Sequence, residues 1–154
     1  MLGAIKWRWL TLLYDRKLEA GLEFQDHAMK LFYRIGIPLM TFASFKNQVA
    51  TGENLNGIEI KLDRHFRETG NLYIETAERS SSDGEYWHKS GIWRDDNSWL
   101  YAIGDYKTLY LFSIKHLRAL EKEYKHVTTP TSQAFLFPLD EASHWSIKEL
   151  GEEC

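Results

Sequence analysis

The chain has 154 residues, of which 44% are hydrophobic and 27% charged, and its formal net charge is −3. This length suits one domain with its own core, so we expect a single domain over residues 1–154 with its core at about 16–139. The slight acidity argues against a nonspecific nucleic-acid coat protein, which needs a basic surface. The lone cysteine, Cys154, excludes an internal disulfide framework and fits a reducing cytoplasm.

The first 35 residues contain one clear helical signal. Apolar residues recur at three- and four-residue spacing over 16–35, which predicts an amphipathic helix that Gly36 ends. Residues 1–15 are predicted to form a strand or short helix that packs on the domain or contacts a second copy. Their longest uncharged run, Trp9–Tyr14, is too short for a signal sequence or a membrane span, so we expect no membrane partner.

Residues 37–49 are rich in apolar and aromatic residues and predict a strand that leads into the loop ATGEN. The stretch 56–78 shows the strongest pattern in the chain. Residues 57–63 alternate apolar and charged side chains, residues 71–78 nearly repeat this alternation, and Thr69-Gly70 precedes the second run. Period-two alternation of this kind predicts a half-buried hairpin with its loop at 64–70.

In that hairpin Glu59 lies directly opposite Glu75, and Lys61 lies on the same face. Like charges set opposite each other destabilise a sheet, so a divalent cation held between the carboxylates is the simplest explanation. The other interpretation is an exposed sheet face with ordinary Glu–Lys pairs. Asp63 either serves as an outer ligand or closes the loop, and Tyr73 either contacts substrate or packs at the rim.

The second half of the chain predicts alternating strands and helices. Residues 79–89 are polar and indicate a loop, and Ser113 is a predicted helix N-cap. Pro138 places its strand at a sheet edge, and Asp140 begins a last helix with Ala142, Trp145 and Leu150 facing inward. The predicted strands cover residues 99–103, 108–112 and 133–139.

The motif Glu59-Ile60-Lys61 resembles the E-x-K element of the PD-(D/E)xK nuclease superfamily. The longer pattern GEN-x-x-GIEIK-x-D, followed by TGNLYIE and SGI-x-RDDN-x-W, resembles a virus- or phage-encoded branch of these restriction-endonuclease-like proteins. E-x-K alone occurs often by chance, whereas this order of blocks, over about Glu19 to Leu120, is more specific. The resemblance implies an α/β fold with an αβββαβ core, in which helices flank a mixed central sheet.

The activity that the resemblance implies is metal-dependent hydrolysis of DNA, in viral recombination, repair or genome processing. Mg²⁺ or Mn²⁺ held by carboxylates neutralises charge at the scissile phosphate, and a neighbouring lysine orients or activates water. The implied catalytic residues are Glu59, Lys61 and Glu75, and the implied metal ligands are Glu53, Glu59, Glu75 and Glu23. The family usually places an Asp after a Pro before E-x-K, and either Glu53 or Glu75 takes that role here. For Glu23, an ordinary solvated helix face is the alternative.

DNA is the expected partner, and cutting two strands favours a homodimer in the cytoplasm, or in the host cytoplasm for a viral protein. A different class of function also fits: a non-catalytic nucleic-acid-binding or assembly module on the same fold. Trp93 is predicted either to stack on bases or to fold under the sheet. Basic side chains expected to contact the DNA backbone are Arg64, Arg67, Arg79, Lys89 and Arg94.

Overall fold

The computed structural model describes residues 2–151, with side chains described from Arg16 onward. The helices are α1 (Leu2–Arg34), α2 (Phe45–Thr51), α3 (Phe66–Thr69), α4 (Ile114–Leu120) and α5 (Leu139–Trp145), with single turns η1 (Gly91–Trp93) and η2 (Glu121–Glu123). The strands are β1 (Ile58–Leu62), β2 (Asn71–Glu78), β3 (His88–Lys89), β4 (Leu100–Gly104), β5 (Thr108–Ser113), β6 (His126–Thr128), β7 (Ser132–Pro138) and β8 (Lys148–Gly151). The contact surface predicted for residues 1–15 lies outside the described side chains.

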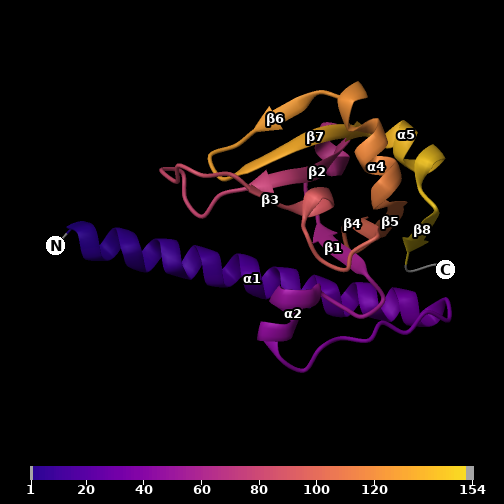
Figure 1. Cartoon of the computed structure of the whole chain (residues 1–154), viewed down its shortest axis with the longest axis horizontal. Coiled ribbons are helices and arrows are strands. Elements are labelled where there is room, and N and C mark those ends of the chain that lie inside the picture. Colours follow the sequence, from indigo (N-terminus) through magenta and orange to yellow (C-terminus); the bar gives the residue numbers. More distant parts are fainter. Residues whose placement is uncertain (1, 152–154) are drawn as a thin grey trace.

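The strands form two four-stranded sheets, so the mixed α/β class is confirmed, but the strands are divided rather than gathered in one central sheet. The first sheet has the order β1-β4-β5-β8 and is mixed, because β1 runs parallel to β4 while the other pairs are antiparallel. The second sheet, in the order β3-β2-β7-β6, is antiparallel throughout. Figure 1 shows the first sheet with α1 along one side and the second sheet on the other.

Helix α1 covers one face of the first sheet because its apolar positions fall on one stripe. Phe24, Ala28, Leu31 and Phe32 are buried against strand residues such as Ile58. This spacing is that of a single helix face. The helix ends as predicted at Gly36, whose φ of 83° lets its amide and the next one bond back to the carbonyls of the last turn.

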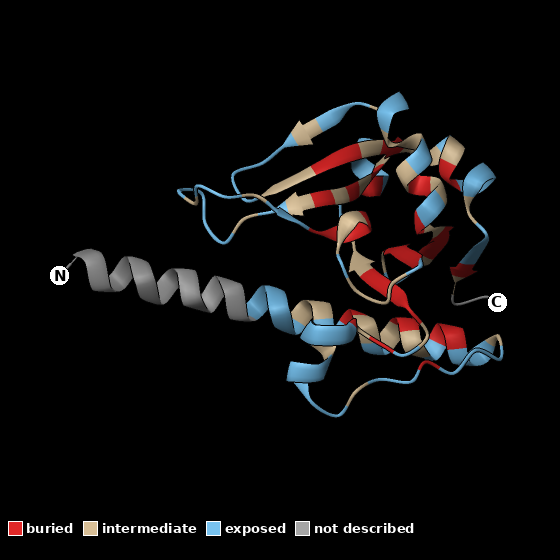
Figure 2. Ribbon diagram, in the orientation of Figure 1, coloured by how far each residue is buried: buried red, intermediate tan, exposed pale blue. Residues whose placement is uncertain are grey.

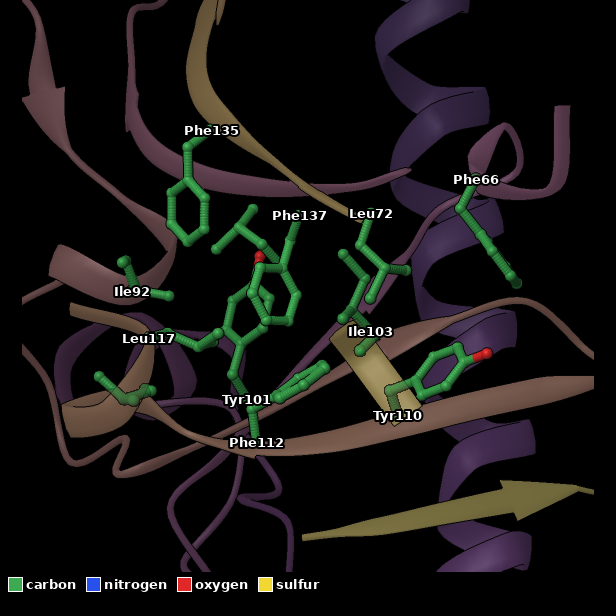
Figure 3. Close-up of a cluster of buried hydrophobic side chains, with 13 residues drawn as sticks. Phe66, Leu72, Ile92, Tyr101, Ile103, Tyr110, Phe112, Leu117, Phe135 and Phe137 are labelled. Carbon is green, nitrogen blue, oxygen red and sulfur yellow. The ribbon is translucent and has the colours of Figure 1, made fainter. Parts of the chain in front are cut away.

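The other face of the first sheet shares a core with the second sheet and with α4 and α5. Tyr101 and Phe112 of the first sheet meet Leu72 and Phe137 of the second, as Figure 3 shows. Aromatic rings in this core meet edge to face, for example Phe112 and Phe137 at 5.6 Å between centroids. Burial is most complete in β4 and β5, and Figure 2 also shows buried residues in β1, β2, β7 and the second half of α1.

The predicted hairpin of residues 57–78 is wrong. Strand β1 pairs with β4, and β2 pairs with β7 and β3, so Glu59 and Glu75 are not cross-strand neighbours. The intervening residues do not form a turn that returns the chain alongside β1, because they contain α3. Asp63 accepts hydrogen bonds from the amides of His65 and Phe66 and, through its second oxygen, from the amide of Tyr73. Asp63 therefore closes this connection and ties the first residues of β2 to the end of β1.

Other predictions are partly corrected. Residues 37–49 form no strand: the chain makes one isolated bridge at Thr41, and residues from Phe45 begin α2. Strand β7 lies between β2 and β6 rather than at an edge. Pro138, which has no N–H to donate, is its last residue, so the rest of the strand can pair on both sides. Leu150 belongs to β8, not to the last helix.

The helix that follows Ser113 is confirmed, and Ser113 accepts the amide of His116 as its N-cap. The two strands before it, β4 and β5, form the predicted antiparallel pair. Among the described residues, no helix combines the length and the apolar character that crossing a membrane requires.

Candidate active site

The site begins with the alternation of β1. Ile58 and Ile60 enter the core beneath α1, so Glu59 and Lys61 point to the opposite face, towards the second sheet. The Lys61 Nζ atom lies 3.0 Å from Glu59 Oε1 and 3.8 Å from Glu75 Oε1. The three predicted catalytic residues are therefore brought together, across two sheets rather than along one hairpin.

Glu59 is the most deeply buried member of this group. Its side chain is 1% exposed, against 32% for Lys61 and 19% for Glu75. Apart from the ion pair with Lys61, its carboxylate has no hydrogen-bond partner in the described part of the chain. An ionised carboxylate in such a place is costly unless a cation compensates it. Lys61 supplies that charge.

Glu53 joins the group from the loop before β1. Its Oε2 accepts a hydrogen bond from the amide of Ile60 at 2.8 Å. Its neighbour Asn54 brackets Ile58, accepting the amide at 3.0 Å and donating to the carbonyl at 2.7 Å. These two side chains occupy the edge of β1 that no strand covers, and they fix Glu53 beside Glu59 and Lys61.

Burial governs the protonation of the group. Loss of solvent raises the pKa of Glu53 to about 7, against the pull of Lys61 and the amide hydrogen bond, and the nearby Glu59 adds to the rise. Burial likewise raises the pKa of Glu59, although Lys61 opposes the rise. Burial alone lowers the pKa of Lys61, but Glu59 and Glu75 outweigh it and raise that pKa, so the ammonium keeps its proton.

Glu75 is held by hydroxyl groups. Ser90 Oγ donates to Oε1 at 2.5 Å, and Ser132 Oγ donates to Oε2 at 3.1 Å. The hydroxyl of Tyr73 in turn donates to Ser132 at 3.0 Å. Gly91, with φ of 52°, lets η1 pass close to β2, because an added Cβ would lie 2.1 Å from the Glu75 carbonyl oxygen. The orientation of this carboxylate is thus set by the second sheet and η1.

The segment that follows η1 closes the other side of the group. Arg94 Nε lies 3.2 Å from Asp96 Oδ2, whose side chain is only 2% exposed, and the charge of Arg94 opposes the pKa rise of both Glu53 and Glu59. Asn97 donates to the carbonyl of Asn54 at 2.8 Å. The blocks GEN and RDDN, some forty residues apart in the sequence, are therefore in contact.

A cleft of about 470 Å³ opens beside Lys61 and Glu75. It lies between α1, the end of β1 and the strands β2 and β7. It gives solvent and ligands a route to the ammonium group, whereas Glu59 is not part of its wall. Its wall includes Lys17, Lys61, Arg64, Tyr73, Glu75 and Tyr101.

Several other predicted residues are placed elsewhere. Glu23 is exposed on α1 and does not line the cleft. Arg67 forms two hydrogen bonds with Asp105, at 2.7 and 3.1 Å. Arg79 donates to the carbonyls of Pro130 and Gly84 and stacks on Trp87, so it stabilises the 79–88 loop.

Trp93 is folded under the second sheet rather than free to stack on bases. Its indole nitrogen donates to Glu121 at 2.7 Å, and the guanidinium of Arg118 covers its ring at 4.7 Å from the centroid. Lys89 also lies over this ring, at 5.9 Å. Of the five basic residues predicted to bind DNA, Arg64 is the one that lines the cleft.

Among the side chains described, no three His, Cys, Asp or Glu residues are grouped closely enough to hold a metal ion. The donor chemistry nevertheless suits one, because carboxylate oxygens are the ligands Mg²⁺ prefers and Glu59 has a buried oxygen without a partner. The assignment of metal ligands therefore stays a prediction. Comparisons with protein-family models, with curated proteins and with solved structures found no match to this chain.

Sequence reasoning missed four side chains that build the site: Asn54, Ser90, Asp96 and Ser132. Three of them, Asn54, Ser90 and Asp96, belong to the sequence blocks GEN, SGI and RDDN. Their polar side chains within these blocks were the signal that could have assigned them to the site. Ser132 had no such signal, because only the pairing of β2 with β7 brings it to Glu75.

Proposed function

We propose that this chain is a metal-dependent DNA endonuclease that hydrolyses phosphodiester bonds, with Glu59, Lys61 and Glu75 as its catalytic group. One observation carries the proposal: an ammonium group flanked by two carboxylates stands at the wall of a cleft, and one of those carboxylates is buried without another partner. Buried charged groups of this kind cost stability and are concentrated at functional sites. The PD-(D/E)xK resemblance adds the reaction type.

Mg²⁺ or Mn²⁺ is the cofactor of the proposed enzyme, and two of the three carboxylates of Glu53, Glu59 and Glu75 would hold it, with water completing the coordination. When bound, the ion would polarise the phosphate and activate water. Raised pKa values of Glu53 and Glu59 support this assignment, because carboxyls that lack solvent gain most from a nearby cation.

Lys61 has the role of stabilising charge. Its pKa is raised, so at neutral pH it is an ammonium group and cannot act as a base. About a third of the side chain is exposed, so Nζ can contact a phosphate oxygen. The ion pair with the buried Glu59 holds Nζ in place. A donor fixed in this way stabilises the negative charge that develops on the phosphate in the transition state.

The test is cleavage of labelled DNA by purified wild-type protein with Mg²⁺ or Mn²⁺ on duplex, nicked, flapped and single-stranded substrates. Lys61→Met keeps the length of the side chain but removes its charge, and we expect the rate per folded molecule, with the folded fraction measured in parallel, to fall by a factor of about a hundred or more. Glu59→Gln should lose activity as well. Lys30→Ala, an exposed α1 residue outside the cleft, is the control and should cut like wild type.

A non-catalytic nucleic-acid-binding module is the second candidate. The observation in its favour is that Lys61 is already neutralised by Glu59 and Glu75, as in a purely structural ion cluster. Wild-type protein that binds DNA but cuts no substrate with either ion would favour this second candidate over the nuclease. Cleavage that survives Lys61→Met unchanged would refute our assignment of the site.

The nuclease proposal also includes a cytoplasmic homodimer, formed in the cytoplasm of the infected host for a viral protein.

A further inference from the structure

The mouth of the cleft carries positive charge that the catalytic group does not use. Lys17 of α1 and Arg64 after β1 both line the cleft and are exposed. Neither forms a salt bridge with any described side chain, in contrast to Arg67, which is bound by Asp105. Asp63, an acid of the cleft wall next to Arg64 in the sequence, has both oxygens occupied by backbone amides. The mouth is therefore suited to an anion.

The interior of the cleft has a different character. Tyr101 and Ile103 are buried there, and Leu62, Leu136 and the ring of Tyr73 complete an apolar and aromatic wall. A duplex presents phosphates and groove edges to a protein, while the faces of its bases are stacked on one another. An apolar wall beside two cations suits a strand whose bases are exposed.

The volume of the cleft also favours a single unpaired nucleotide over a duplex. The cleft holds about 470 Å³, which lies within the range of about 300–1,000 Å³ of small-ligand pockets. A duplex keeps its bases paired and stacked, so it does not offer a single nucleotide to a space of this size. Space of this size accommodates one nucleotide unit taken out of a stack.

We propose that the cleft binds one unpaired nucleotide of a DNA strand, with its phosphate at Lys17 and Arg64 and its base against Tyr73. This inference rests on the proposed function, and it names the substrate class: DNA with single-stranded character, such as a flap, a loop or a frayed end. Lys17 and Arg64 act in binding, and the neighbouring Lys61 and Glu75 are then close to the backbone of the same strand.

The experiment is a binding titration in EDTA, so that it does not depend on cleavage. Fluorescence anisotropy compares a short labelled single strand with the duplex of the same sequence. We expect the single strand to bind at least about tenfold tighter. Lys17→Ala and Arg64→Ala should each weaken strand binding several-fold and reduce the salt slope by about 0.7 per lost phosphate contact. Lys30→Ala and Arg34→Ala make the same charge changes on α1 outside the cleft and should leave binding unchanged.

Tyr73→Leu separates base contact from charge, because it keeps an apolar side chain but removes the ring. Strand affinity should fall about fivefold or more, while duplex affinity stays the same. Equal affinity for strand and duplex would overturn the inference, as would cleft and control variants that behave alike. Strand preference without any cleavage would instead leave the inference intact and refute the nuclease. Cleavage of DNA without strand preference would refute this inference and leave the nuclease proposal intact.

Discussion

Glu53→Gln is the substitution that most directly tests the electrostatics of the site. The pKa of Glu53 is about 7 in the folded protein, against 4.5 for an ordinary glutamic acid. The difference of about 2.5 units corresponds to about 3 kcal/mol of folding free energy, at 1.36 kcal/mol per unit. Because the folded-state pKa is the higher one, this contribution is complete below pH 4.5 and is lost as pH rises through 7.

Glutamine removes the ionisation but keeps an oxygen that can accept the Ile60 amide. In EDTA, the variant should match wild type near pH 4.5 and exceed its free energy of unfolding by up to about 3 kcal/mol at pH 8. Urea denaturation at a series of pH values measures this difference. Glu23→Gln, at an exposed position, is the control and should follow the wild-type curve at every pH.

Added Mn²⁺ extends the same experiment. An ion held partly by Glu53 should stabilise wild type at pH 8 by mass action, and it should stabilise Glu53→Gln less. Identical pH profiles for wild type and Glu53→Gln in EDTA would refute the account of this carboxyl as a buried group. If Mn²⁺ stabilised wild type and Glu53→Gln equally, Glu53 would not be a metal ligand, although it could still be a buried carboxyl.

Two further predictions concern stability in urea. Lys61→Met should lower the free energy of unfolding by about 3–5 kcal/mol at pH 8, because it leaves the carboxylate of Glu59 buried without a counter-charge. Adding Glu59→Gln to this variant should restore most of that stability. A Lys61→Met variant as stable as wild type would contradict the ion pair. Gly91→Ala should cost about 2–4 kcal/mol, because its φ is 52° and a Cβ would meet the Glu75 carbonyl. Gly21→Ala on α1, where nothing lies within 4 Å, should instead stabilise by about 0.5–1 kcal/mol, and similar losses in both would contradict the close approach at Gly91.

The sequence alone determined the elements whose signals are local. The stripe of apolar residues before Gly36 predicted the second half of α1, and Ser113 predicted the start of α4. Alternation in residues 57–63 placed Glu59 and Lys61 on one face, because side-chain direction in a strand depends only on the period of two. Glu75 was assigned to the same group from the same kind of pattern.

Strand partners were decided by the tertiary structure. Two alternating runs separated by seven residues fit a hairpin, yet Asp63 accepts the amides of His65 and Phe66 at the start of α3, and β2 pairs with β7, whose sequence lies some sixty residues away. Pairing at such separation depends on which apolar faces can be buried together, and alternation carries no information about it. Glu75 therefore reached Lys61 by a route that the sequence did not predict, across two sheets, and Ser132 arrived with the same strand pairing.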